Sequence, residues 1–313
     1  MLLRSPIILL TIFATSFLLF YIIQKLFIKF NFTDQINDRS SHSSIATLSG
    51  GITIFISVLL VSSFFYISKL EIFDFSLIVP LSLLVVVGLY DDIYNIDFKL
   101  KFIFQIIAAK ILIDNGLIID NLHGVLGIFE LNRILAQLLT IFIIVAIINS
   151  INFIDGIDGL ASAVVILFIL SFEFFSVDVS PFFNLSLILI IAILPIFIFN
   201  FRKVNKIFLG DSGSLFLGGL VSTYVVYILS NNYIIKPEFD LHKIIFVFSI
   251  LAYPIIDLIR ITILRIFKGK SPFVADKNHI HHILIKKTNS HFVTTLLLLL
   301  GSLIFIIFIQ ILF

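Results

Sequence analysis

The 313-residue chain contains no cysteine and no tryptophan, and only 13% of its residues are charged. The absence of cysteine excludes disulfides, thiolate metal sites and a thiol nucleophile. Without tryptophan, an aromatic belt at a membrane interface must consist of tyrosine and phenylalanine. Soluble domains carry about 25% charged residues, so a chain with few charges and 60% hydrophobic residues cannot cover a water-facing surface. The net charge of +2 does not indicate a nucleic-acid partner.

Apolar segments recur along the whole chain, whose mean hydropathy is +1.18. A spanning helix needs about 20 mainly apolar residues. Ten candidates predict an all-α, polytopic integral membrane protein: 5–28, 46–67, 75–90, 101–119, 131–148, 160–177, 183–200, 213–230, 243–264 and 292–312. The first is longer than a signal-peptide core of about 7–15 residues, so we expect it to be retained. No internal repeat or soluble domain is visible, which predicts a single transmembrane domain over residues 1–313.

Lysine and arginine are distributed unevenly between the two sets of connections. Fifteen of the 21 basic residues lie after the first, third, fifth, seventh and ninth segments or at the adjoining helix ends. Cytoplasmic loops carry such an excess of positive charge. The sequence therefore predicts that these five connections are cytoplasmic. Because the number of crossings is even, it also predicts that both termini lie outside.

The unusual polar clusters fall on the same predicted cytoplasmic side. They are residues 37–51, 91–101, 149–158, 202–214 and 265–282. Five loops that are distant in sequence thus bring chemically active side chains to one membrane face.

Asp91 and Asp92 end the third apolar segment. Adjacent carboxylates repel each other unless a cation is close, and acidic residues at a helix C-terminus oppose the helix dipole at a cost of about 0.3–1 kcal/mol. These costs favour a cation-binding or proton-accepting pair. The alternative is an ordinary solvated helix end.

The segment from Asn149 to Asp158 places two amides and two carboxylates at a spacing of three: Asn149, Asn152, Asp155 and Asp158. On a helix, this spacing would bring them near one face. Such oxygen ligands suit magnesium, which binds few protein carboxylates together with substrate phosphates. The spacing of a calcium-binding EF-hand and its final glutamate are absent. A plain turn remains the alternative reading.

Asp211 lies before the eighth apolar segment, between Gly210 and Gly213. It is a good candidate for a helix N-cap. The free backbone N–H groups of a helix start also form a phosphate-binding site. The nearby basic residues are either phosphate ligands or positive-inside charges; they are Arg202, Lys203 and Lys206.

The last cytoplasmic loop contains His279, His281 and His282 close to Lys277. A zinc site is one reading, but two of the histidines are adjacent and no cysteine or H-E-x-x-H pattern accompanies them. We prefer the reading in which the imidazoles donate hydrogen bonds to a diphosphate.

Phosphoryl transfer requires a metal that bridges phosphate oxygens, together with cations that neutralise charge. The polar clusters contain such groups, and their place at a membrane face predicts one water-soluble phosphorylated substrate and one lipid substrate. A transporter is the main alternative, but its polar site usually lies near the midplane and often shows repeat symmetry. A non-catalytic scaffold is the other alternative, although it would not need so many acidic residues.

Six motifs occur in the order found in a known family: Asp38–His42 with Gly50–Gly51, Asp91–Asp92, Asn149–Leu160, Phe208–Gly218, Tyr253–Asp257 and Asp276–His282. In this order they resemble the polyprenyl-phosphate N-acetylhexosamine-1-phosphate transferases of glycosyltransferase family 4. These include the initiators of O-antigen and teichoic-acid-linkage synthesis and, more distantly, the phospho-MurNAc-pentapeptide transferase. The chain departs from the pattern between Ser43 and Gly50, where the expected prolines are absent.

The resemblance implies a reaction in which a polyprenyl phosphate, expected to be undecaprenyl phosphate, attacks the β-phosphorus of a UDP-sugar and releases UMP. It implies Mg²⁺, or Mn²⁺, with Asn152 and Asp211 as the matching metal ligands. The expected catalytic residues are Asp91, Asp92, Asp155, Asp158, His279, His281 and His282. The expected substrate-binding residues are Lys101, Asn149, Asp158, Arg202, Lys277, His281 and His282.

The resemblance also sets the biological expectations. UDP-GlcNAc is the default donor, and UDP-MurNAc-pentapeptide is the alternative for the same chemistry. The product would be the first lipid-linked intermediate of a cell-surface glycan, such as lipopolysaccharide O-antigen or a cell-wall polymer. The expected location is the bacterial cytoplasmic membrane, and a homodimer is expected by family analogy.

Overall fold

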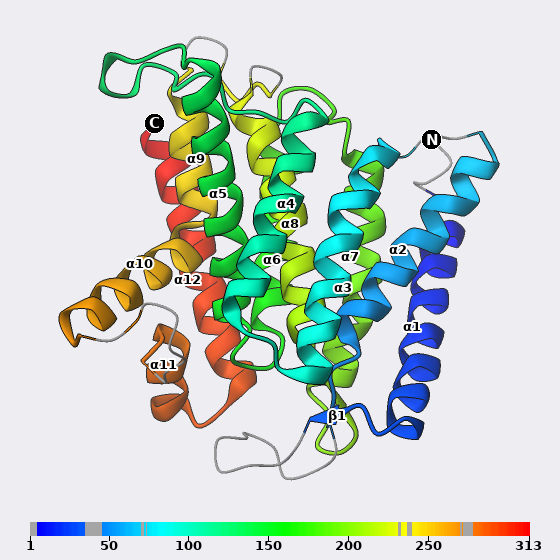
Figure 1. Cartoon of the computed structure of the whole chain (residues 1–313). Coiled ribbons are helices and arrows are strands. Elements are labelled where there is room, and N and C mark those ends of the chain that lie inside the picture. Colours follow the sequence, from blue (N-terminus) through cyan, green and yellow to red (C-terminus); the bar gives the residue numbers. More distant parts are fainter. Residues whose placement is uncertain are drawn as a thin grey trace.

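The computed structural model describes residues 5–34, 46–69, 72, 74–230, 233–236, 240–269, 271 and 278–313 (Figure 1). Helices dominate: α1 Pro6–Lys29, α2 Gly50–Ile67, α3 Ile78–Tyr94, α4 Phe98–Asp114, α5 Arg133–Ile154, α6 Leu160–Phe175, α7 Phe183–Asn200, α8 Gly210–Leu229, α9 His242–Ile250, α10 Ala252–Phe267, α11 Ile280–Thr288 and α12 His291–Leu312. The short 3-10 helices η2 Phe75–Leu77 and η3 Val125–Gly127 precede α3 and α5. Each of the ten predicted segments overlaps a helix, which confirms the all-α, multi-pass prediction.

Most of these helices are apolar enough to cross a membrane. Among the described residues, seven meet the length and hydropathy required, namely α1, α2, α3 with η2, α5, α7, α8 and α12. The bent pair α9–α10 brings the number to eight, and α6 is apolar but has only 16 residues. The 17-residue α4 carries four charged side chains, which lower its hydropathy. The number of ten crossings therefore stays a prediction.

Polar side chains define several helix starts. Asp97 accepts a hydrogen bond from the Lys99 N–H at 3.1 Å, so α4 begins three residues earlier than predicted. Asn132 accepts from the Leu135 N–H at 3.0 Å at the start of α5. Such caps satisfy N–H groups that have no partner within the helix.

Helix α8 lies at the centre of the bundle, packed mainly against α3 and α5. Buried residues make up 94% of its most apolar stretch, against 17% for α12 at the periphery. Glycines such as Gly218, which faces the Ile148 backbone of α5, allow this close packing. The start of α8 is therefore held firmly between its neighbours, and this start carries Asp211.

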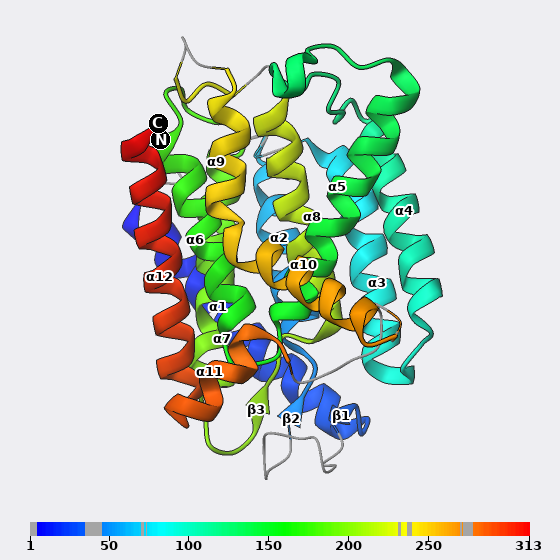
Figure 2. The ribbon, with the colours of Figure 1, turned by 90° about the vertical axis from the view of Figure 1, so that its left-hand side faces the viewer.

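The predicted continuous helix at 243–264 is wrong. The chain bends by 75° between α9 and α10. Pro254 lies in the first turn of α10, where a missing N–H is tolerated and the ring favours a new helix start. α10 then runs obliquely across the bundle (Figure 2), with Asp257 and Arg265 buried while Ile259 and Ile263 are exposed.

A small sheet joins three distant segments at one end of the bundle. Strand β2 (Ala46–Thr47) pairs antiparallel with β1 (Thr33–Asp34) and parallel with β3 (Lys206–Ile207). The pairing continues as hydrogen bonds from the Gly50 and Gly51 N–H groups to the carbonyls of Phe208 and Leu209, at 2.9 and 2.8 Å. These contacts fix the starts of α2 and α8 relative to each other.

The sheet, α11 and the loop between α3 and α4 lie at one end of the bundle, whereas α1 begins and α12 ends at the other (Figures 1 and 2). Four predicted polar clusters, at 91–101, 149–158, 202–214 and the described part of 265–282, converge at the sheet end. The Asp38–His42 motif lies outside the described residues. Convergence of the polar loops is thus a property of the fold.

Candidate active site

A cavity of about 360 Å³ opens at the sheet end of the bundle, between α3, α4, α5, α8, α10 and the start of α11. Seven of the predicted site residues line it: Asp91, Lys101, Asn149, Asn152, Asp211, His279 and His282. They come from five helices and one loop. The fold therefore assembles one polar site from segments that are far apart in sequence.

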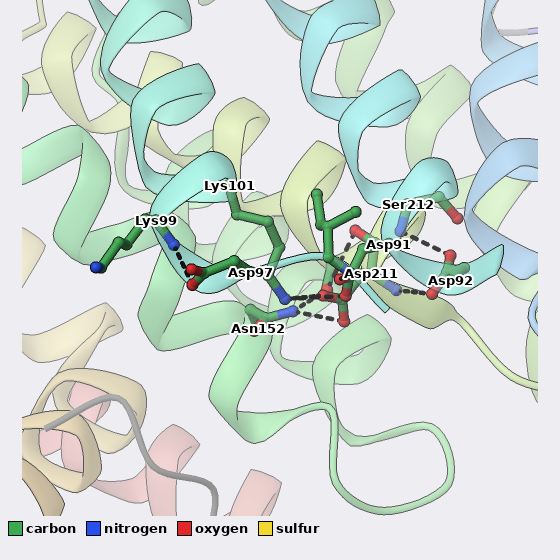
Figure 3. A network of polar contacts seen from close by, with 10 residues as sticks. Asp91, Asp92, Asp97, Lys99, Lys101, Asn152, Asp211 and Ser212 are labelled. Atoms are coloured by element: carbon green, nitrogen blue, oxygen red, sulfur yellow. Dashed lines mark hydrogen bonds and ion pairs between the residues drawn. The ribbon is translucent and has the colours of Figure 1, made fainter. Parts of the chain in front are cut away.

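Asp211 is the centre of the polar network (Figure 3). Its Oδ2 accepts a hydrogen bond from the Lys101 Nζ at 2.8 Å, and its Oδ1 accepts one from the Asn152 Nδ2 at 3.0 Å. The same Lys101 Nζ lies 2.9 Å from the Asp91 Oδ2. One lysine thus bridges two carboxylates on α3 and α8.

Asp91 and Asp92 have different surroundings. Asp91 lines the cavity, and its other oxygen accepts the Ile96 N–H at 2.8 Å. Asp92 points to the start of α8, where its two oxygens accept the N–H groups of Asp211 and Ser212 at 2.7 and 3.0 Å. The adjacent carboxylates thus take separate positions, one at the cavity and one at a helix start.

The alternative in which Asp211 is an N-cap is not observed. α8 begins at Gly210, so Asp211 lies in its first turn, where a carboxylate is favoured by the helix dipole. The acceptor for the free N–H groups comes from Asp92 on α3 instead. The capping function is therefore supplied from a different helix, and Asp211 remains free to face the cavity.

The four polar residues of the Asn149–Asp158 segment do not lie on one helix. Asn149 and Asn152 lie on α5, which ends at Ile154, before Asp155 and Asp158. The Asn152 Nδ2 donates to Asp211 and also to the Ser214 Oγ at 2.8 Å. The Asn149 Nδ2 donates to the Gln105 Oε1 at 2.7 Å. Since both amide hydrogens of Asn152 are used, its amide oxygen is the atom left for a ligand.

Asp155 and Asp158 lie in the loop after α5 and do not line the cavity. Burial, together with the negative charges of Asp211, Asp92 and Asp158, raises the pKa of Asp155 well above its usual value. A cation nearby would relieve this repulsion.

Asp158 is buried in a network of its own. Its carboxylate pairs with Lys206 of β3 and lies 3.4 Å from the His291 Nδ1 of α12. Its carbonyl oxygen accepts the Thr295 hydroxyl at 3.1 Å. In this arrangement Asp158 joins the loop to two other elements.

The histidines also divide into separate positions. His279 and His282 line the cavity, whereas His281 is buried beneath them against Gly156, where any side chain would overlap its ring. Burial, with the nearby His282 and His279, lowers the pKa of His281 to about 3, so His281 is neutral at physiological pH.

Asp257 orients His279. Its Oδ2 lies 2.7 Å from the His279 Nδ1, and its Oδ1 accepts from the Arg260 Nη2 at 2.8 Å and from the Ile280 N–H at 3.0 Å. Ligand atoms of Asp257, His279 and His281 lie within 4.8 Å of one another, as a metal site would require. The adjacent Arg260 already neutralises Asp257, which makes the zinc reading unfavourable.

The predicted substrate-binding residue Arg202 does not line the cavity. The Arg202 guanidinium lies 4.0 Å from the centre of the Phe199 ring, a cation–π contact at the end of α7. Lys277 lies outside the described residues.

The sequence reasoning did not single out six further lining residues: Phe98, Phe102, Gln105, Phe153, Leu215 and Arg265. Gln105 follows Lys101 by four residues, so helical spacing could have placed it on the same face. Arg265 is 3% exposed, and its guanidinium lies 5.6 Å from the Phe153 ring. Its position depends on the bend before α10, which the apolar pattern did not reveal.

The arrangement suits a divalent cation and a phosphate-containing ligand. Asp91, Asp211 and the Asn152 amide offer oxygen ligands of the kind magnesium prefers. Lys101, Arg265 and the histidines are groups that can donate hydrogen bonds to phosphate oxygens. The aromatic rings of Phe98, Phe102 and Phe153 provide apolar walls.

The chain is similar to several known proteins. A family model described as glycosyl transferase family 4 matches residues 74–229, which include α3, α4, α5 and α8. A probable undecaprenyl-phosphate N-acetylglucosaminyl 1-phosphate transferase of Bacillus subtilis is 31% identical, over 91% of this chain and 78% of the relative. The corresponding transferase of Pasteurella multocida, named undecaprenyl-phosphate alpha-N-acetylglucosaminyl 1-phosphate transferase, is 33% identical, with coverages of 88% and 77%.

A decaprenyl-phosphate N-acetylglucosaminephosphotransferase of Mycolicibacterium smegmatis is 30% identical, over 90% of this chain and 74% of the relative. These similarities extend over nearly the whole chain and over most of each relative. The chain belongs to glycosyl transferase family 4.

Proposed function

We propose that this protein transfers N-acetylglucosamine 1-phosphate from UDP-GlcNAc to undecaprenyl phosphate in the bacterial cytoplasmic membrane. The observation that carries the proposal is the cavity in which Asp91, Asn152 and Asp211 meet Lys101 at one end of an apolar bundle. The names of the relatives support both the sugar phosphate and the polyprenyl acceptor.

In the proposed reaction, a phosphate oxygen of the lipid attacks the β-phosphorus of UDP-GlcNAc. The bond between this phosphorus and the bridging oxygen breaks, and UMP leaves with that oxygen. The products are UMP and the polyprenyl-diphospho-sugar. The second pKa of a phosphate monoester is about 6, so the lipid phosphate is largely dianionic at neutral pH. Asp91 therefore serves positioning and charge rather than proton removal.

Asp211, Asp91 and the Asn152 amide oxygen are the groups that would hold Mg²⁺. When bound, the ion would neutralise negative charge on the phosphates. Lys101, Arg265, His279 and His282 line the same cavity and would position the diphosphate. The buried His281 ring packs against the His282 ring, with 4.3 Å between their centres.

The direct test is UMP release by the purified protein with undecaprenyl phosphate and a panel of UDP-sugars that includes UDP-GlcNAc and UDP-MurNAc-pentapeptide. We expect release with UDP-GlcNAc, dependent on Mg²⁺ and partly restored by Mn²⁺. Asp211→Ala is expected to lower the rate by at least about 100-fold while the protein still inserts into the membrane, because it removes a proposed metal ligand.

A folded protein that releases no UMP with any donor would contradict the enzyme assignment and leave the transporter or scaffold reading. Release with UDP-MurNAc-pentapeptide alone would show that this compound is the donor and that the reaction type is the proposed one. Retained activity in Asp211→Ala would remove Asp211 from the metal site. The homodimer expected by family analogy is a separate prediction that light scattering in detergent would check.

A further inference from the structure

Lys101 lies between the two carboxylates proposed to face the metal. It extends from α4 to α3 and α8, with its Nζ 2.9 Å from the Asp91 Oδ2 and 2.8 Å from the Asp211 Oδ2 (Figure 3). Its side chain is 22% exposed. The ammonium group therefore takes the position between Asp91 and Asp211 that a cation bridging them would need.

We propose that Lys101 is an exchangeable counter-ion. In the metal-free protein it holds Asp91 and Asp211 together. When the divalent cation binds, Lys101 leaves Asp211 and contacts the diphosphate of the sugar nucleotide. The inference rests on the proposed function, because it concerns the same cation and the same donor substrate.

Electrostatic repulsion favours the exchange. Magnesium binds carboxylate oxygens at about 2.0–2.1 Å, so it would lie close to the present position of the Lys101 Nζ. Two positive groups that share the Asp211 Oδ2 would repel each other strongly at this separation. A strongly hydrated ammonium on a flexible four-carbon stem is the partner that can move.

The cavity offers a second position for the Lys101 ammonium group. Phe98, Phe102 and Gln105 line the cavity on the same face of α4, so the lysine stem already borders the space where a ligand would lie. Before metal binding, the lysine charge offsets one of the two carboxylates. After a dication has neutralised both of them, the lysine charge is available for the phosphates.

A purely structural ion pair is the competing explanation. In that case Lys101 would stabilise the contact between α3, α4 and α8 in every state of the protein. Its removal would loosen the carboxylates and weaken metal binding. The exchange predicts the opposite sign for metal binding, and this difference separates the two explanations.

The test uses the full-length protein in detergent. Binding of Mn²⁺ without substrates is measured by the loss of its free electron paramagnetic resonance signal. Binding of radiolabelled UDP-GlcNAc at saturating Mg²⁺ is measured without lipid acceptor, so no turnover occurs. For Lys101→Met, we expect the Kd for Mn²⁺ to fall about tenfold or more and the Kd for UDP-GlcNAc to rise about tenfold or more.

Lys99→Met is the matched control, because it removes the same charge two residues away. Lys99 is exposed, and its side chain points away from the carboxylates (Figure 3). We expect both dissociation constants to stay within about twofold of the wild type for this variant, since charges at exposed positions are largely screened. Lys101→Arg keeps the charge and should keep the weak Mn²⁺ binding. If Lys101→Met does not fold, Lys101→Gln serves instead.

Unchanged or weaker Mn²⁺ binding in a folded Lys101→Met protein would overturn the exchange. Tighter Mn²⁺ binding with unchanged UDP-GlcNAc binding would overturn the contact with the diphosphate. A wild-type protein that releases no UMP would contradict the proposed function, and this is a separate measurement. The Mn²⁺ titration does not depend on that result.

Discussion

Two adjacent aspartates at the end of α3 have separate tasks in this structure. Asp91 faces the cavity and Lys101, whereas Asp92 accepts the first free N–H groups of α8. A carboxylate at a helix N-terminus gains both hydrogen bonds and a favourable interaction with the helix dipole. Asp92 is thus a positioning residue, because it holds the turn that carries Asp211.

This assignment predicts that substitutions of Asp92 lower the stability of the protein more than substitutions of Asp91 do. Asp92→Leu should destabilise the protein by about 1–3 kcal/mol, because two N–H groups of α8 lose their acceptor. Asp92→Asn keeps one acceptor and should cost less. Thermal unfolding in detergent measures both. Asp91→Asn is the control, since it should lower UMP release while changing the unfolding temperature less than Asp92→Leu does. An unfolding temperature that Asp92→Leu leaves unchanged would disprove the capping function.

His281 shows why a histidine motif cannot be assigned as one unit. Its ring is fully buried, the Tyr253 hydroxyl lies 3.3 Å from its Nδ1, and its Nε2 faces Gly156. The neighbouring His279 and His282 reach the cavity. His281, which lies between them in sequence, instead packs against Gly156 and supports the loop after α5.

At the scale of the elements, the approach of α3 to α8 determines the site. Gly88 of α3 lies against the backbone of Asp211 and Ser212, and Gly51 of α2 lies against Gly213. A Cβ atom at either glycine would overlap backbone atoms, which cannot turn aside as a flexible side chain can. These glycines allow three helices to meet where Asp91 and Asp211 share Lys101.

Gly88→Ala should therefore separate α3 from α8 and move Asp91 away from Asp211. We expect a loss of about 1–3 kcal/mol in stability from overpacking and a fall in UMP release of at least about tenfold. Gly301→Ala is the matched control, because Gly301 is also helical and a Cβ there would meet nothing within 4 Å. An active, equally stable Gly88→Ala protein would show that the close approach is not required.

At the scale of the whole molecule, the two ends of the bundle differ in chemistry. The cavity, the small sheet and α11 lie at one end, together with the basic residues at the ends of α1 and α7 (Figure 1). The loop with η3 lies at the other end. Positive charge predicts that the cavity end is cytoplasmic, where nucleotide sugars would reach it.

The absence of cysteine makes this orientation directly testable. Leu126 in η3 is 92% exposed, and Val204 at the cavity end is 62% exposed. In intact cells, a membrane-impermeant maleimide should label Leu126→Cys and not Val204→Cys. Both variants should react after permeabilisation, which controls for the reactivity of each thiol. The reverse pattern would place the cavity outside and contradict the predicted topology.

The sequence by itself determined the helical class, the ten apolar segments and most of the residues that line the cavity. Apolar runs report burial in lipid directly, and motifs such as Asp91–Asp92 and Asn149–Asn152 lie on single helices whose spacing is local. Local patterns also located the starts of α4 and α5 to within a few residues. They did not show that α5 continues past Asn152 and ends before Asp155.

Only the tertiary structure decided which polar residues meet. It separated Asp91 from Asp92, paired Asp158 with Lys206, buried His281 and brought Arg265 to the cavity through the bend at α10. Each of these contacts joins residues from different helices or loops. Spacing along a helix fixes the direction of a side chain, but its partner depends on how closely neighbouring helices pack. In this protein glycines such as Gly88 set that distance. Their effect depends on the backbone that lies opposite them, which for Gly88 is that of Asp211 and Ser212.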